Sequence, residues 1–198
     1  MTVGKRGVKM KNSFWKVTLC LFMLLTLVVS TAAAASLEER RQELRQKTSV
    51  TLDKLYQQQP SAKKAIENSA GYAVFNNTGF KLGILGSSHG RGMAVNNQSG
   101  REAFMKMNEF QAGLGLGIKE YALIFVFDNE AAWNSFVDKG WEFSAQATAA
   151  ADDGMNGDSM EGAISVTSGV WMYQMTTKGL ALELAVKGTR YYKDSDFN

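Results

Sequence analysis

The chain has 198 residues, 45% hydrophobic and 21% charged, and its formal net charge is +3. This apolar fraction is sufficient for a packed core and excludes a disordered chain. The positive charge gives no support for nucleic-acid binding, because five basic residues lie within the first sixteen positions, ahead of any acidic residue.

The first 35 residues have the pattern of a secretory signal peptide. The five basic residues precede an apolar run over residues 17–29, and Ala32–Ala35 supplies the small residues of a cleavage site. The run is thirteen residues long, which is short for a membrane span, although an uncleaved membrane anchor is the alternative interpretation. We therefore expect an exported protein of the periplasm or cell envelope, with a single mature domain over residues 36–198.

Loss of this segment would change the charge and the cysteine content. Of the 22 basic residues 17 would remain against 19 acidic ones, so the mature domain would carry a net charge of −2. Cys20, the only cysteine, would also be removed. We therefore expect neither a disulfide nor thiol chemistry in the mature domain.

Residues 36–69 are predicted to form a helical segment. Apolar residues recur at close to a helical period over residues 37–59, within a charged sequence. Pro60 ends this pattern, and Ser61 is placed to cap a second, short helix that reaches Ile66. The first helix either packs on its own domain or binds a lipid surface or a partner.

The rest of the chain, residues 70–198, is predicted to be a β-rich core. Short β-prone runs alternate with turn residues, a spacing that is typical of antiparallel hairpins. The predicted strands are Tyr72–Phe75, Phe80–Leu85, Gly92–Val95, Ala103–Met107, Gln111–Ile118 and Tyr121–Phe127. The predicted turns are Asn76–Gly79, Ser87–Gly90, Asn96–Gly100 and Lys119–Glu120. Because the last of these strands is almost wholly apolar, we expect it to be central and buried on both faces.

One inserted helix and a closing hairpin are expected within this core. Asp128 and Asn129 can start a helix over residues 131–137. Residues 170–187 are predicted to form a hairpin that turns near Lys178. The expected fold is therefore α+β, with an N-terminal helical segment packed on a strongly coiled, mainly antiparallel β-sheet or partly closed barrel.

Three glycines alternate with apolar residues in the middle of the chain. Gly113, Gly115 and Gly117 would share one face of a strand, with apolar side chains on the other face. Such a bare stripe indicates a tight barrel wall, a strongly coiled sheet, or close approach by a helix, another backbone or a ligand. A nucleotide-binding loop is excluded, because no phosphate-binding lysine motif or helix start follows the glycines.

No set of residues supports catalysis. A nucleophile-elbow spacing occurs at Gly86-Ser87-Ser88-His89-Gly90, but no helical pattern follows it. The chain's only histidine, His89, is adjacent to the candidate serine and is poorly placed to act as its base. We therefore interpret this segment as a polar hairpin turn and expect no enzyme.

A metal or cofactor site is not expected either. Asp152, Asp153, Asn156 and Asp158 have the composition of a calcium loop, but their order does not fit an EF-hand. A solvated acidic turn explains these residues better. A single histidine without cysteine partners also makes a transition-metal site improbable.

Most aromatic residues of the β-rich core fall at positions where burial is expected. Four are placed where a ring could instead meet a lipid headgroup or an apolar ligand: Trp141, Trp171, Tyr191 and Tyr192. Burial in the core is the alternative for each of them.

Several motifs occur in an order that matches a known domain family. The first are Ser69-Ala-Gly-Tyr-Ala-Val-Phe75, Lys81-Leu-Gly-Ile-Leu-Gly86 and His89-Gly-Arg-Gly-Met93. Next come the glycine-containing strand over residues 110–118, the apolar strand over residues 122–127, and closing segments over residues 144–151, 172–181 and 187–192. In this order the chain resembles the SYLF lipid-binding domain family over roughly residues 45–194.

The resemblance implies lipid binding without catalysis. SYLF domains are known as phospholipid binders, and certain eukaryotic members also engage actin, which an exported chain would not meet. We therefore expect binding to a phospholipid or membrane surface, with headgroup contacts from Lys63, Lys64, Lys81, Arg91 and Lys178. The alternative is an envelope scaffold that binds another protein through a sheet edge or the N-terminal helix.

Overall fold

The computed structural model describes residues 36–143, 160–176, 179–181 and 188–198. The expected signal peptide, residues 1–35, lies outside these ranges, and so does the acidic segment that contains Asp152 and Asp158. The chain divides into two compact units, Met1–Arg40 and Arg41–Asn198. The described residues of the first unit, 36–40, are helical, and the second unit contains all the described strands.

The predicted helical segment is confirmed. A helix, here called the long helix, covers residues 36–58, and α2 follows over Ser61–Asn68. The expected cap from Ser61 is wrong, because Pro60 occupies the N-cap position and Ser61 is already the first helical residue. Ser61 lies inside the helix rather than before it, and no side-chain cap hydrogen bond forms at this end. Its hydroxyl instead accepts a hydrogen bond of 2.7 Å from the side-chain amide of Gln59.

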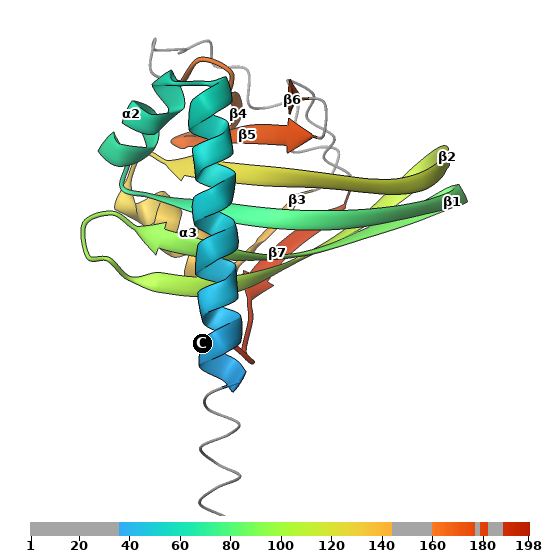
Figure 1. Ribbon diagram of the computed structural model, residues 1–198, viewed down its shortest axis with the longest axis horizontal. Coiled ribbons are helices and arrows are strands. Elements are labelled where there is room, and N and C mark those ends of the chain that lie inside the picture. Colours follow the sequence, from blue (N-terminus) through green and yellow to red (C-terminus); the bar gives the residue numbers. More distant parts are fainter. Residues whose placement is uncertain (1–35, 144–159, 177–178, 182–187) are drawn as a thin grey trace, which may run out of the picture. The chain divides into compact units, whose positions relative to one another are not determined.

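Two long strands form the centre of the sheet (Figure 1). β1, Gly71–Asn96, and β2, Glu102–Phe127, each have 26 residues and pair antiparallel as one hairpin. The pairs run from Val95 and Glu102 beside the turn to Gly71 and Phe127 at the other end. Both strands therefore extend much farther than the short strands that the sequence predicts.

Only one of the four predicted turns is confirmed, the one over Asn96–Gly100. There the Asn96 side chain accepts hydrogen bonds from the backbone amides of Gln98 and Ser99, and Gly100 has a φ of 68°. The turns predicted at residues 76–79, 87–90 and 119–120 are wrong, because β1 and β2 continue through them.

The hairpin folds back on itself, so that two parts of β1 come into contact. Gly92 lies against Phe75, and Gly90 lies against Asn77. A Cβ atom on Gly92 would come within 2.6 Å of the Phe75 ring, so a larger residue does not fit there. The residues that indicated turns at positions 76–79 and 87–90 therefore allow close contact between strands, which is the physical reason for the wrong prediction.

The fold-back coincides with a register shift between Gly83 and Leu85. Such a bulge adds one residue to one strand, bends it and increases its twist. Here β2 carries the additional residue, because Gly83 pairs with Gly115 and Leu85 pairs with Ala112. Along β1, the residues that enter the concave core change from odd numbers, as at Phe75, to even numbers, as at Ala94. This change keeps the apolar side chains of both parts of β1 on the same side.

β2 is the central strand, because β1 pairs along one of its edges and both β5 and β7 pair along the other. β5, Val170–Thr176, pairs with its residues 121–127, and β7, Thr189–Lys193, pairs with its residues 105–109. The remaining strands are β3, Trp141–Phe143, beside β7, and β4, Ile164–Thr167, and β6, Gly179–Ala181, beside β5. The seven strands within the described ranges form one antiparallel sheet. The expected α+β fold with a strongly coiled antiparallel sheet is confirmed.

The predicted closing hairpin is confirmed in its described part. β5 pairs antiparallel with β6, and Thr176 pairs with Gly179 across the turn. Residues 177–178 and 182–187, which include Lys178, lie outside the described ranges.

α3, Glu130–Lys139, is the helix predicted after Asn129. The Asn129 side chain accepts a hydrogen bond of 2.9 Å from the amide of Ala132, as an N-cap residue does. Trp133, Phe136 and Val137 are buried. α3 thus contributes its apolar side to the core of the sheet.

The curled sheet has a core on each face. The concave core joins α3 to side chains that include Phe75, Met105, Phe125 and Tyr191. The convex core places Leu52 and Leu55 of the long helix and Ile66 of α2 against Val74, Ile124 and Val126. Alternate residues of the strand 121–127 therefore enter different cores, which confirms its predicted burial on both faces.

Candidate functional site

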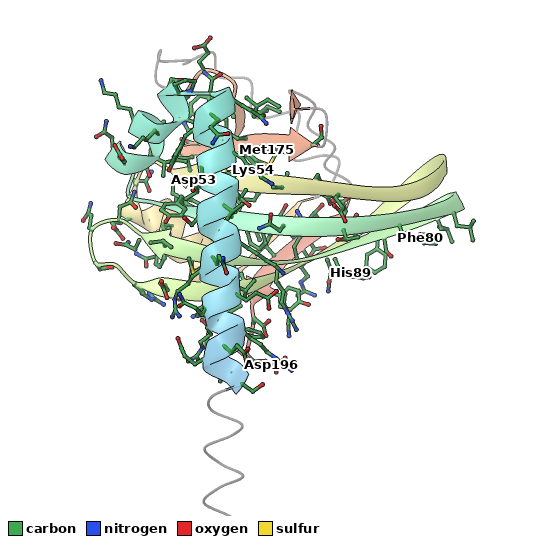
Figure 2. The ribbon with its side chains drawn as sticks, in the orientation of Figure 1. Asp53, Lys54, Phe80, His89, Met175 and Asp196 are labelled. Atoms are coloured by element: carbon green, nitrogen blue, oxygen red, sulfur yellow. The ribbon has the colours of Figure 1, made fainter. Side chains whose placement is uncertain are left out.

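Large exposed apolar side chains gather in the middle of the two long strands, where the hairpin folds back. Phe80, Leu82, Leu85 and Phe110 are 55%, 61%, 70% and 72% exposed, and in the described part of the chain only Val50 joins them as an exposed large hydrophobic residue. Figure 2 shows Phe80 where β1 and β2 extend beyond the other strands. We call this part, residues 79–87 of β1 and 110–119 of β2, the ribbon end.

The exposed side chains of the ribbon end share the convex face. Phe80 lies an even number of positions from Val74, which packs in the convex core. Beyond the register shift, Leu85 lies an odd number of positions from Ala94, which belongs to the concave core. By the same alternation Leu82 lies on the same face as Phe80. Phe110 also lies on this face, because it is an odd number of positions from Met107 of the concave core. The four residues therefore form an apolar continuation of the face that the helices cover elsewhere.

The charge of the ribbon end is basic. Its 19 positions include Lys81 and Lys119 and contain no aspartate or glutamate. Exposed His89 and Glu120 lie just inside it, one on each strand. The ribbon end thus combines apolar and cationic residues in a domain whose expected mature charge is negative.

A polar layer lies between the ribbon end and the aromatic core. Tyr121 donates a hydrogen bond of 2.8 Å to the Glu109 carboxylate, and the Thr189 hydroxyl donates one of 3.4 Å to the same group. Asn77 and Ser88 are buried at neighbouring strand positions. Burial raises the pKa of the Tyr121 hydroxyl well above its usual value of 10, so it remains a donor at neutral pH.

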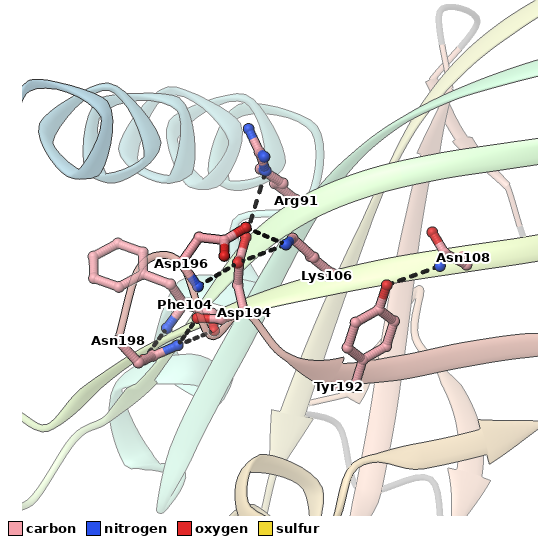
Figure 3. A network of polar contacts seen from close by, with 8 residues as sticks. All are labelled: Arg91, Phe104, Lys106, Asn108, Tyr192, Asp194, Asp196 and Asn198. Atoms are coloured by element: carbon pink, nitrogen blue, oxygen red, sulfur yellow. Dashed lines mark hydrogen bonds and ion pairs between the residues drawn. The ribbon is translucent and has the colours of Figure 1, made fainter. Parts of the chain in front are cut away.

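A second polar network joins the chain's last residues to the hairpin (Figure 3). The buried Asp194 carboxylate lies 2.8 Å from the Lys106 amine and 3.5 Å from the Arg91 guanidinium. Lys106 also pairs with Asp196 at 2.9 Å. Hydrogen bonds to Asp194 and Asp196 raise the pKa of Lys106, and the bond from Lys106 lowers the pKa of Asp196. Arg91 further stacks on Phe197, with 4.9 Å from its guanidinium carbon to the ring centroid.

The basic residues predicted to contact headgroups do not form one cluster. Lys63 and Lys64 are exposed on α2, and Lys63 lies 3.9 Å from the Glu67 carboxylate. Arg91 takes part in the Asp194 network, and Lys81 belongs to the ribbon end by its strand position. α2 and the ribbon end lie at opposite ends of the sheet in Figure 1. The side chain of Lys81 lies outside the described part, as does Lys178.

Two comparisons with known proteins bear on the family. The model of the Ysc84 family, described as Las17-binding protein actin regulator, matches residues 108–198. Beta cell expansion factor A of Aeromonas veronii is 34% identical over 161 residues, which cover 80% of this chain and 59% of that relative. The chain belongs to the Ysc84/SYLF domain family. The predicted family is therefore confirmed, although the chain spans only about three fifths of the relative's length.

The nucleophile-elbow spacing of this SYLF domain lies inside a strand. Ser88 is 1% exposed and lies in β1, whereas an elbow nucleophile needs an exposed position on a strand-to-helix turn. His89 is exposed, and its Nδ1 atom lies 3.4 Å from the Asn108 Oδ1 atom. The interpretation of this segment as a hairpin turn is wrong, but the geometry gives no support to a serine nucleophile.

The four candidate rim aromatics of the SYLF domain have different environments. Tyr191 is 3% exposed and packs on Phe75 with ring centroids 4.9 Å apart, so the alternative given for it, burial in the core, is the correct one. Trp141 packs partly buried against the concave core. Trp171 donates a hydrogen bond of 3.0 Å to Asp128. Tyr192 is half-buried and accepts a hydrogen bond from Asn108.

Sequence reasoning missed the exposed residues of the ribbon end, because strand predictions do not say which faces remain uncovered. A usable signal was present: two apolar stretches, residues 79–87 and 110–119, contain lysine but no acidic residue. Among the described residues of the SYLF domain, none of the helices has the length and hydropathy to cross a membrane. Across the same ranges, no three histidine, cysteine or acidic side chains gather closely enough to hold a metal ion.

Proposed function

We propose that this SYLF domain binds a phospholipid membrane surface and does no chemistry there. The observation that carries this proposal is the exposure of Phe80, Leu82, Leu85 and Phe110, whereas most other large apolar side chains in the described part of the chain are buried. Grouped apolar side chains on a protein surface indicate a contact with a membrane, a ligand or a partner. Lipid binding, which the family resemblance implies, agrees with the membrane choice.

The absence of catalysis is part of the proposal. Ser88 is buried, and His89 is the only histidine of the chain. A hydrolytic triad would need an exposed nucleophile and a base oriented toward it. A role in recognition requires only the exposed surface.

We place this membrane in the cell envelope. The leader-like residues 1–35 support export, since they combine a basic start, a short apolar run and small residues before position 36. Fractionation of the producing cell, with the mass of the recovered protein, tests this location. A protein that retains residues 1–35 in the cytoplasm would contradict it.

The headgroup contacts predicted for Lys63, Lys64, Lys81, Arg91 and Lys178 remain a prediction. Arg91 already faces the Asp194 carboxylate, and Lys63 faces Glu67. A headgroup phosphate would have to compete with these carboxylates. Lys81 is the member of the set that belongs to the ribbon end.

Flotation with liposomes tests the proposed function. The protein is mixed with vesicles of graded anionic lipid content at two salt concentrations, and the floating fraction is measured. We expect flotation that rises with anionic lipid and falls with salt, because exposed charges are screened by ions. Absence of flotation at every composition would contradict lipid binding and favour the alternative, a scaffold that binds another protein.

A further inference from the structure

We propose that the ribbon end enters the interface of an anionic phospholipid bilayer and is the part of the domain that holds it there. This inference rests on the proposed function and names the surface that performs it. Phe80, Leu82, Leu85 and Phe110 would contact the boundary between headgroups and acyl chains. The helices and the rest of the sheet would stay in water.

The convex face changes character along the hairpin. Near the base, the convex-face side chain of Val74 is covered by Leu52 and Leu55 of the long helix. At the ribbon end the same face has no such cover in the described part of the chain, and Phe110 and Leu85 are about as exposed as a surface residue. Transfer of one such side chain from water to an apolar medium favours binding by roughly tenfold or more. Four of them are sufficient for a measurable partition into lipid.

Charge selects the occupant of the ribbon end. The ribbon end carries Lys81 and Lys119 and no carboxylate, so its local sign is opposite to that of anionic headgroups. An anionic lipid interface that receives the whole ribbon end receives both its apolar and its basic residues.

The polar residues at the border limit the depth of entry. Thr78 and Glu120 pair across the strands and are exposed, and His89 is exposed on the other part of β1. From Glu120 to Leu116 the strand rises by roughly 13 Å. An exposed carboxylate resists transfer into lipid, so Glu120 would stop the ribbon end at the depth of an interfacial segment.

The same geometry orients the domain on the membrane. α2, which carries Lys63 and Lys64, lies at the opposite end of the sheet from the ribbon end in Figure 1. A flat bilayer that receives the ribbon end does not reach α2. Among the predicted headgroup ligands, Lys81 is therefore assigned to the membrane, and Lys63 and Lys64 are assigned to water.

The orientation is measured with a fluorescent probe at single cysteines. The full chain carries Cys20→Ser, and a polarity-sensitive dye is attached to Phe80→Cys, Phe110→Cys or Lys64→Cys. Vesicles of phosphatidylcholine and phosphatidylglycerol include lipids with a quencher on the upper acyl chain. We expect a blue shift and quenching for the probes at positions 80 and 110, and neither change at position 64.

A second measurement removes the apolar side chains without a probe. Phe80→Ser combined with Phe110→Ser should weaken vesicle partitioning by about tenfold or more. Val50→Ser is the matched control, because Val50 is an exposed hydrophobic residue on the long helix, 45% exposed. It should leave partitioning unchanged. Melting temperatures of both variants should equal that of the wild type, since all three side chains are exposed.

The possible outcomes separate this inference from the proposed function. Quenching at position 64 without quenching at positions 80 and 110 would overturn the inference and leave lipid binding intact. A protein that binds no vesicles would overturn both. A blue shift at position 80 that grows with protein concentration in the absence of lipid would identify a second copy as the occupant and also overturn the inference.

Discussion

The hydroxyl of Tyr121 donates a hydrogen bond of 2.8 Å to the carboxylate of Glu109, although both residues belong to β2 and stand twelve positions apart. In a straight strand twelve residues span roughly 40 Å. The contact therefore joins the two halves of a strand that folds back. Glu109 is 4% exposed, so this bond satisfies a carboxylate in the interior. It also lies directly behind the ribbon end.

Removal of this bond should weaken the fold. Tyr121→Phe is expected to lower the free energy of unfolding by about 2 kcal/mol, because a buried carboxylate loses a donor. Urea denaturation followed by circular dichroism measures the change. Tyr192→Phe is the matched control, since Tyr192 is half-buried and accepts its hydrogen bond from the neutral amide of Asn108. A loss for Tyr121→Phe no greater than for Tyr192→Phe would contradict the assigned role.

The contact between the two parts of β1 should tolerate no added side chain. Gly92→Ala is expected to lower the free energy of unfolding by about 1–3 kcal/mol, because the new Cβ atom meets the Phe75 ring. Gly100→Ala serves as a control in the same hairpin, because a Cβ atom there meets nothing within 4 Å. Any loss of unfolding free energy in this variant comes from the φ of 68° alone. A Gly92→Ala protein as stable as the wild type would show that the fold-back is looser than described.

The Asp194 network should fasten the last residues of the chain. Lys106→Met is expected to lower the free energy of unfolding by about 2 kcal/mol, because the buried Asp194 carboxylate loses its nearest cation. Lys63→Met provides the comparison, since the exposed pair with Glu67 contributes only about 0.3 kcal/mol. Thermal unfolding measures the loss of stability in both variants. Equal melting temperatures would contradict a stabilising contribution of the Asp194 network.

Alkaline pH should destabilise the folded state through its tyrosines. Burial raises the pKa of Tyr56 and of Tyr173 from 10 to about 12. Because these pKa values are higher in the folded chain than in the unfolded chain, the stability they provide is complete below pH 10 and declines as the pH rises toward about 12. Tyrosinate absorbance should therefore appear at higher pH in the native protein than in guanidinium. Coincident titration curves would contradict this prediction.

The sequence predicted the elements whose burial follows a simple period. The helical spacing over residues 37–59 predicted the long helix, and the apolar run from Tyr121 to Phe127 predicted the central strand. Asn129 predicted α3 because its side chain is a good N-cap. β4, at Ile164–Thr167, was missed, because four residues without clear alternation carry too little pattern.

The wrong predictions have a common cause in the fold-back. Asn77, Ser88 and Gly90 are frequent turn residues, and local chemistry does not reveal that they line a contact between distant parts of one strand. The placement of Arg91 depends on Asp194, which lies about a hundred positions away. The exposure of the ribbon end depends on where the helices stop. The glycines Gly113, Gly115 and Gly117 lie in β2, but their surroundings are outside the described part, so the predicted close approach stays a prediction.

The most direct test of lipid binding through the ribbon end compares two double variants in one flotation series. One is Phe80→Ser with Phe110→Ser, and the other is Lys63→Glu with Lys64→Glu on α2. With vesicles of high anionic content at low salt, we predict that the phenylalanine variant stays at the bottom of the gradient while the lysine variant floats with the wild type. Flotation of the phenylalanine variant together with loss of the lysine variant would contradict the account and assign the lipid surface to α2.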